Sequence, residues 1–146
     1  MRTLRQQVVI ERDIEDVFAL VSAPDRYPEF FKGLTRWRLL SERPGLDARY
    51  RVLMKVGSIE AGGTVKVDEW IPPERIGWTW EKGLHQWGRW VLSKEPGGTS
   101  LLLEASFHLS GGPAGLLVER LAGRTVARNL RATLLAARRL LEDEDA

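Results

Sequence analysis

The stretch GRWVLSKEPGGTSLLLEASFH, residues 88–108, decides how this chain folds. Apolar side chains occupy every second position on both sides of Pro96-Gly97-Gly98. They are Trp90, Leu92, Leu101, Leu103, Ala105 and Phe107. A period of two is typical of strands that bury one face, and Pro-Gly-Gly is a turn signal. The stretch therefore predicts two antiparallel strands, near 86–94 and 99–109, joined as a hairpin.

The same alternation extends back from this hairpin to about residue 35. Turn signals at Pro44-Gly45, Gly57-Ser58, Pro72-Pro73 and Lys82-Gly83 divide that region. They predict strands near 35–42, 48–56, 59–69 and 74–81. Because short breaks join consecutive strands, the whole region should form an antiparallel meander. Gly62-Gly63 lies inside one strand and predicts a bulge or a sharp bend.

The flanking segments add one strand and three helices. Residues 5–11 alternate and predict a first strand. Asp13 can cap a helix whose buried face is Ile14, Val17, Phe18 and Val21, and Pro24 ends it. A second short helix should place Tyr27, Phe30 and Phe31 on one face, with Gly33 as its stop. A long helix should run from Pro113 to about residue 142.

Alternation also assigns the faces of the sheet. The polar parity carries Lys66, Arg75, Thr79, Lys94, Glu104 and His108. The apolar parity should place Trp78, Trp80 and Trp90 on a concave face with Met54 and Phe107. Five of the six tryptophans fall within residues 70–90, which indicates either a wide core of large side chains or an aromatic-walled pocket. Gly123, in the middle of the long helix, should lie close to the interior.

Residues suited to catalysis or metal binding are few. The chain has two histidines, which are distant in sequence, and no cysteine, so we expect no metal site and no Ser-His-Asp triad. Glu69 shares its parity with Val65 and Val67 and would face inward unless a bulge shifts the register. Exposure at the rim or an arginine partner is the alternative. We expect no cofactor, because the glycine-rich pieces show no phosphate-loop pattern.

Length and charge set the remaining bounds. The chain has 146 residues, which predicts one domain over residues 1–146. A net charge of +2 argues against nucleic-acid binding by the molecule as a whole. The N-terminus lacks a signal-peptide core and no apolar run reaches 18 residues, so we expect a cytoplasmic protein without a membrane span. Arginines gathered in the last segment are either a solvated helix face or a site for an anionic partner.

Three segments in this order resemble the polyketide cyclase/dehydrase family of the START-like (SRPBCC) superfamily, which includes the birch pollen allergen. They are VVIERDIEDVFALVSAPDRYPEFFKGL, GRWVLSKEPGGTSLLLEASF and VERLAGRTVARNLRATLLAARRLLE. The run DRYPEF, residues 25–30, is also similar to coenzyme Q-binding START proteins. The resemblance implies an α+β helix-grip fold: a seven-stranded curved antiparallel sheet, two short helices and a long C-terminal helix enclosing a cavity. It supplies no catalytic residue that matches here.

Three functional hypotheses follow. The first is binding or carrying of a hydrophobic small molecule, such as a lipid, a quinone or an aromatic compound. The second is a cyclase, aromatase or dehydratase that holds a polyketide-like chain in a productive shape. The third is a regulator that binds a macromolecular partner through the basic C-terminal helix. The predicted ligand-binding residues are Phe30, Tyr50, Met54, Val65, Trp78, Trp80, Trp90, Phe107, Leu117 and Leu121.

Overall fold

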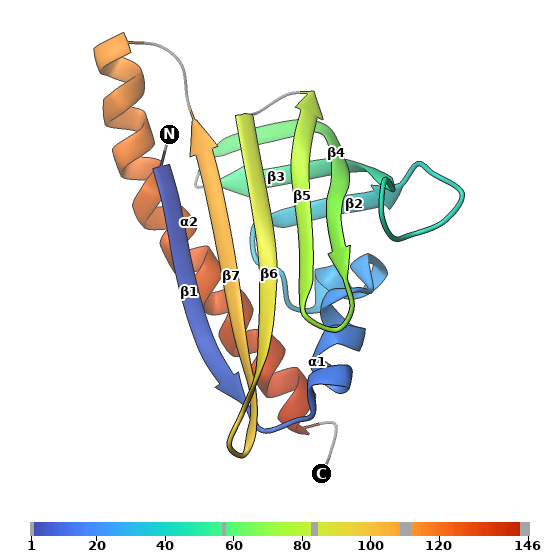
Figure 1. Cartoon of the computed structure of the whole chain (residues 1–146). Helices are drawn as coiled ribbons and strands as arrows, with labels where there is room; N and C mark the ends of the chain where they lie inside the picture. The colour runs from blue at the N-terminus through green and yellow to red at the C-terminus, as the bar shows by residue number, and fades with distance from the viewer. Residues whose placement is uncertain (1, 57, 83–84, 109–111, 144–146) are drawn as a thin grey trace.

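The computed structural model describes residues 2–56, 58–82, 85–108 and 112–143, and it gives the course of the backbone but not the side chains for residues 2, 56, 59 and 112–121 (Figure 1). The described elements, in chain order, are β1 (Arg2–Ile10), α1 (Ile14–Val21), the 3-10 helix η1 (Pro24–Glu29), β2 (Leu34–Leu39), β3 (Arg49–Val56), β4 (Ile59–Ile71), β5 (Arg75–Lys82), β6 (His85–Glu95), β7 (Gly98–His108) and α2 (Gly112–Asp143).

The strands form one seven-stranded antiparallel sheet in the order β1-β7-β6-β5-β4-β3-β2. This order confirms the predicted meander, with β1 added beside the last strand. In the β6–β7 hairpin, Trp90 lies opposite Leu103, so the two apolar rows share a face. Gly97 closes the turn with φ +84°, a conformation that glycine adopts without strain. The sheet curls around α2, which lies behind it in Figure 1, and this is the expected helix-grip arrangement.

Two short helical segments connect β1 to β2, as predicted. Asp13 stands at the N-cap of α1, but its side chain makes no capping bond; its carbonyl oxygen accepts the amides of Asp16 and Val17 instead. The second segment is a 3-10 helix rather than an α-helix, and Pro28 inside it supplies no amide hydrogen for a helical bond. The predicted stop at Gly33 is wrong, because the segment ends at Glu29 with Phe30 as its C-cap. Gly33, with φ +90°, lies instead in the turn that leads into β2.

Helix α2 runs along β1 and places Leu130, Leu134, Ala137 and Leu141 in the core, at the predicted helical spacing. Two residues just after β1 bind the C-terminal end of α2. The Arg12 guanidinium donates to the Leu141 carbonyl oxygen, and the Glu11 amide donates to Glu142 Oε2 at 3.0 Å. Gly123 is buried, as predicted. Among the described helices, none combines the length and hydrophobicity needed to cross a membrane.

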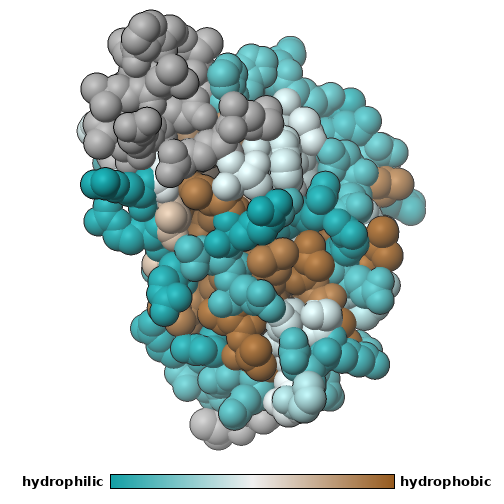
Figure 2. All heavy atoms as spheres, turned by 60° about the vertical axis from the view of Figure 1, so that its left-hand side comes forward, coloured by the Kyte–Doolittle hydropathy of each residue, from teal (hydrophilic) through white to brown (hydrophobic). Residues whose placement is uncertain are grey.

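The concave face of the sheet carries the core, and the convex face is mostly polar. Trp78, Trp80, Trp90 and Phe107 are all buried, which agrees with the predicted parity. From the side of α2 and β1, the surface shows hydrophobic residues between hydrophilic ones (Figure 2). One residue of the polar parity departs from the pattern: Glu104 is only 8% exposed, because Arg5 and Arg89 pair with it across the neighbouring strands.

The bulge or bend predicted in β4 is present. Glu69, however, does not face inward, as it would with an unshifted register. The register of β4 against β5 shifts twice, once next to Gly63, between Thr64 and Val65, and again between Val67 and Glu69. A side chain on Gly63 would lie 2.6 Å from the Trp80 ring, so glycine is required for this close approach. The second shift turns Glu69 to the convex face, where it pairs with Arg75 at 3.1 Å.

Candidate functional site

A mainly apolar cavity of about 80 Å³ lies between the concave face of the sheet, the segment after η1 and the middle of α2. Strands β2 to β4 supply one wall and β5 to β7 supply another. The described residues that line it are Phe31, Lys32, Leu34, Trp37, Met54, Ala61, Trp78, Gln86, Leu103, Ala105, Phe107, Ala122, Val126, Asn129 and Leu130. Lys32 is exposed and so marks a side on which the cavity meets solvent.

Three of the predicted ligand-binding residues lie in this wall: Met54, Trp78 and Phe107. Five others are buried in the surrounding core and are not among the lining residues: Phe30, Tyr50, Val65, Trp80 and Trp90. The side chains of Leu117 and Leu121 lie outside the described part of the chain. A role in ligand binding stays a prediction for all ten residues.

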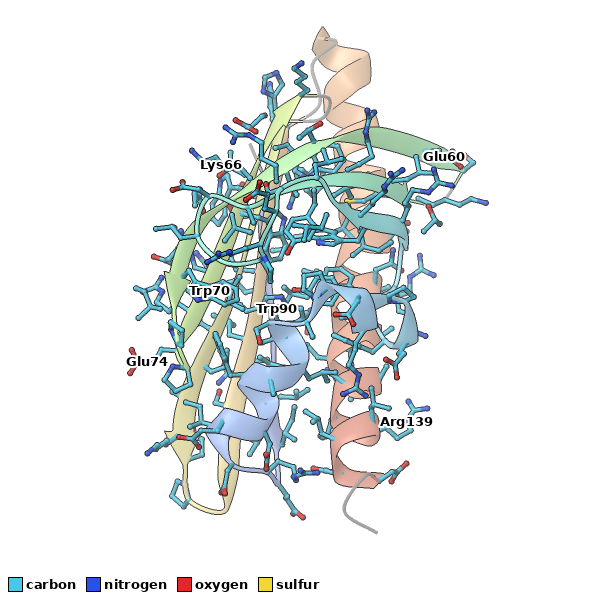
Figure 3. The ribbon with its side chains drawn as sticks, turned by 90° about the vertical axis from the view of Figure 1, so that its right-hand side faces the viewer. Glu60, Lys66, Trp70, Glu74, Trp90 and Arg139 are labelled. Atoms are coloured by element: carbon cyan, nitrogen blue, oxygen red, sulfur yellow. The ribbon has the colours of Figure 1, made fainter. Side chains whose placement is uncertain are left out.

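The aromatic side chains of the YPEFF segment, residues 27–31, pack on Trp90, so Trp90 does not line the cavity. Its ring centroid lies 6.4 Å from those of Tyr27 and Phe30 and 5.7 Å from that of Phe31. In Figure 3 Trp90 lies in the interior beside α1 and η1. Of these aromatic residues, Phe31 alone is among the lining residues. The segment therefore both seals the core and supplies part of the wall.

Tyr27 fixes η1 to its neighbours through its hydroxyl group. The hydroxyl donates to the Val21 carbonyl oxygen at 2.6 Å and accepts the Trp90 indole N–H at 3.2 Å. Burial raises the pKa of Tyr27 well above its ordinary value, although the Trp90 bond opposes part of that rise. The hydroxyl therefore stays protonated and both hydrogen bonds persist at neutral pH.

The segment after η1 is also tied to α2 and to β3. The Lys32 amide donates to Thr133 Oγ1 at 2.9 Å, and the Lys55 amide donates to the Gly33 carbonyl oxygen at 2.7 Å. Thr133 is fully buried, so its hydroxyl is available only to groups inside the protein. These bonds fix the rim beside Asn129, whose amide nitrogen would lie 3.1 Å from a Cβ on Gly33.

Trp78 occupies its position in the wall because residue 88 on the next strand is glycine. The two residues are opposite each other, and a Cβ on Gly88 would lie 2.5 Å from Cε2 of the Trp78 ring. The indole N–H of Trp78 donates to Gln86 Oε1 at 3.2 Å, and Gln86 Nε2 donates to the Trp87 carbonyl oxygen at 2.7 Å. Gln86 is therefore a polar residue of the wall with both ends of its amide already engaged.

Trp37 lines the cavity but is not among the ligand-binding residues predicted from the sequence. It lies on β2, the strand at the edge of the sheet, between the exposed Arg36 and Arg38. Its ring centroid lies 5.3 Å from that of Tyr27 and 6.0 Å from that of Trp78. Among the described residues its buried Nε1 has no hydrogen-bond partner. The run TRWRLL gives no clear alternation, so the only signal was a large aromatic residue between two charges.

The polar side chains in the described wall are Lys32, Gln86 and Asn129, whereas the carboxylates with defined partners lie elsewhere. Glu69 is paired with Arg75 and, at 3.3 Å, with Arg89 on the convex face, which agrees with the alternative of an arginine partner. The two histidines lie opposite each other where β6 begins and β7 ends, and both are exposed. No group of metal-binding side chains was found in the described ranges.

The sequence matches the family described as "Polyketide cyclase / dehydrase and lipid transport" over residues 1–142. The chain belongs to this family. Membership supports a role in binding a hydrophobic ligand or in cyclising a polyketide, which is the coarse form of the function predicted from the sequence. No curated protein matches the sequence significantly.

Solved structures with the same fold share little sequence with this family member. TTHA0849 from Thermus thermophilus has a TM-score of 0.86 at 18% identity, over 99% of this chain and 100% of that one. A START superfamily protein from Mycobacterium smegmatis has a TM-score of 0.76 at 18% identity, covering 97% and 98% of the two chains. StfQ, a di-domain ARO/CYC of the steffimycin biosynthetic pathway, has a TM-score of 0.76 at 13% identity, over 98% of this chain and 51% of that one. At these identities the likeness shows the fold alone.

Proposed function

We propose that this protein binds a hydrophobic small molecule in the cavity between the sheet and α2. The observation that carries the proposal is the wall itself, which is built of aromatic and aliphatic side chains with three polar ones. Small-molecule sites are typically concave and apolar, with a small number of polar groups that orient the ligand. The family description, which names lipid transport beside cyclase and dehydrase activity, supports the same function.

The size of the cavity bears on the size of the ligand. A cavity of roughly 150 Å³ holds benzene, and about 80 Å³ is smaller than that. A lipid, a quinone or a fused-ring compound therefore needs part of the wall to move outward. Met54 is suited to such a change because its side chain is unbranched and flexible, and Val126 on α2 is only half-buried. We propose that the ligand enters on the side of Lys32 and displaces these two side chains.

A cyclase, aromatase or dehydratase would use the same cavity to hold a reactive chain in shape, and the family description includes this chemistry. The described wall offers Lys32, Gln86 and Asn129 as its polar side chains. These groups suit holding and orienting more than proton transfer, since general acid–base catalysis typically uses histidine or a carboxyl group. Binding is therefore the function that the geometry supports best.

An arginine stripe on α2 supports a second candidate, the binding of an anionic macromolecule. Arg124, Arg128, Arg131 and Arg139 are exposed, and Arg139 points outward from α2 in Figure 3. Arginines three or four residues apart repel one another along a helix, so this stripe lowers the stability of α2 slightly. We expect Arg124→Gln/Arg128→Gln/Arg131→Gln to elute from heparin at lower salt than the native protein; equal elution would remove this candidate.

The test of the main proposal is binding of the neutral apolar probe N-phenyl-1-naphthylamine, followed by its fluorescence. Val126→Phe should reduce binding at least tenfold because the larger side chain fills the cavity. Val9→Phe is the matched control, since Val9 is 46% exposed and does not line the cavity. Native mass spectrometry of the purified protein should also detect a retained small molecule. Equal probe binding by both variants, with no retained compound, would contradict the proposal.

A further inference from the structure

The indole N–H of Trp37 is a buried hydrogen-bond donor that has no acceptor among the described residues. Trp37 lines the cavity. A buried polar group without a partner costs free energy, so nearly all such groups in folded proteins are paired. An unpaired donor on a side chain of the wall therefore needs an explanation, and a group on a ligand that displaces part of the wall supplies one.

The other tryptophans of this region show that the feature is local. The indole N–H of Trp78 is bonded to Gln86, and that of Trp90 is bonded to the Tyr27 hydroxyl. Trp80 also has a buried Nε1 without a partner, but it is not among the lining residues. Among the described residues, Trp37 thus combines a position in the wall with an unused donor.

The Trp37 ring is held by three other aromatic rings. Its centroid lies 5.3 Å from that of Tyr27, 5.4 Å from that of Tyr50 and 6.0 Å from that of Trp78. The Tyr27 hydroxyl is already engaged with Val21 and Trp90, so it does not serve as the missing acceptor. A donor held in this way loses little freedom when a ligand binds, and such preorganisation favours affinity.

The remaining polar groups of the wall define the kind of acceptor. Gln86 uses both ends of its amide within the protein, and the exposed Lys32 is a donor at the rim. A neutral carbonyl oxygen adds an acceptor without adding a donor that would need a partner of its own. A carboxylate would lose its hydration among apolar side chains, at much greater cost.

We propose that the ligand is an apolar molecule bearing a neutral carbonyl oxygen, and that this oxygen accepts the Trp37 Nε1–H. The inference rests on the proposed function, because it concerns the ligand of the same cavity. Trp37 is then a specificity-determining residue, since it distinguishes a carbonyl compound from a hydrocarbon of the same shape.

The experiment compares 2-acetylnaphthalene with 2-isopropenylnaphthalene, which replaces the carbonyl oxygen by a methylene group and keeps the shape. Dissociation constants are measured by titration calorimetry for the native protein and for Trp37→Phe and Trp70→Phe. The native protein should bind the ketone about five- to tenfold more tightly, the ratio expected for one neutral hydrogen bond. In Trp37→Phe the ratio should fall to about one while binding of the hydrocarbon persists. Trp70→Phe, a change at a tryptophan that packs on Phe18 and does not line the cavity, should keep the native ratio.

The infrared carbonyl band of the ketone bound to the native protein gives a second readout that needs no variant. It should lie at lower frequency than the band of the ketone in hexane, as a hydrogen-bonded carbonyl does. Equal affinities for the two probes and an unshifted band would overturn the role of Trp37 and leave the proposed function standing. Absence of binding by both probes would overturn the proposed function together with this inference.

Discussion

Replacing Gly88 by alanine should destabilise the protein, because the new methyl group would overlap the ring of Trp78. A Cβ at this position would lie 2.5 Å from Cε2 and 2.9 Å from Cη2 of the ring. Carbon atoms pack at about 3.5–4.0 Å, so the ring must move by about 1 Å. Trp78 is 5% exposed, and the space open to it is the cavity.

The expected size of the effect follows from two contributions. Overpacking a buried site costs about 1–3 kcal/mol. Moving the ring also breaks the 3.2 Å hydrogen bond from Trp78 to Gln86, which contributes about 1 kcal/mol. Together they lower the free energy of unfolding by about 2–4 kcal/mol, or the melting temperature by about 5–15 °C for a chain of this size.

The assay is urea unfolding followed by far-ultraviolet circular dichroism, with Gly62→Ala as the matched control. A Cβ on Gly62 would meet Leu53 Cδ1 at 3.5 Å and the Val52 carbonyl oxygen at 3.7 Å, which are ordinary contacts. Alanine there should leave stability unchanged or raise it by up to about 1 kcal/mol. Gly88→Ala should also weaken binding of the apolar probe, since the displaced ring enters the cavity. Equal stability of the two variants would refute the assigned contact between Gly88 and Trp78.

Two further predictions concern ionisation and surface charge. The pKa values of Tyr27 and Tyr50 are both raised, chiefly by burial, so above pH ~10 the unfolded chain loses these protons first. The folded state then binds more protons, and the free energy of unfolding should fall as pH rises through that range; a rise would contradict the burial of Tyr27. Arg38 lies directly opposite Arg51 on the neighbouring strand, so Arg38→Glu should raise stability by about 0.2–1 kcal/mol at low salt. That gain should shrink in 1 M NaCl, and its persistence there would argue against an electrostatic origin.

The sheet and the buried apolar face of α2 were predictable because both arise from simple periodicity. The alternation through residues 88–108 sets the β6–β7 hairpin and its buried face, as the pairing of Trp90 with Leu103 shows. The helical spacing of Leu130, Leu134, Ala137 and Leu141 likewise identifies the buried side of α2. These patterns repeat over many residues, so a single irregularity does not hide them.

The wall of the cavity was less predictable because it depends on local irregularities and on contacts between distant segments. A register shift between Val67 and Glu69, with no glycine in β4 to mark it, turns Glu69 from the concave to the convex face. Trp37 lies on an edge strand whose sequence does not alternate clearly. Trp90 has the parity of a cavity residue, but the aromatic side chains of the segment at Tyr27 cover it. Parity predicts the face of a strand, whereas packing decides which residues of that face remain beside an opening.

A crystal structure of the protein with 2-acetylnaphthalene would show whether the space between the concave face and α2 is a ligand-binding site. We expect electron density for the naphthalene ring beside Met54, Phe107 and Val126, with the ketone oxygen within about 3 Å of Trp37 Nε1. A compound bound only on the outer surface, or an unchanged cavity in crystals grown at saturating probe, would show that this space is not a ligand-binding site.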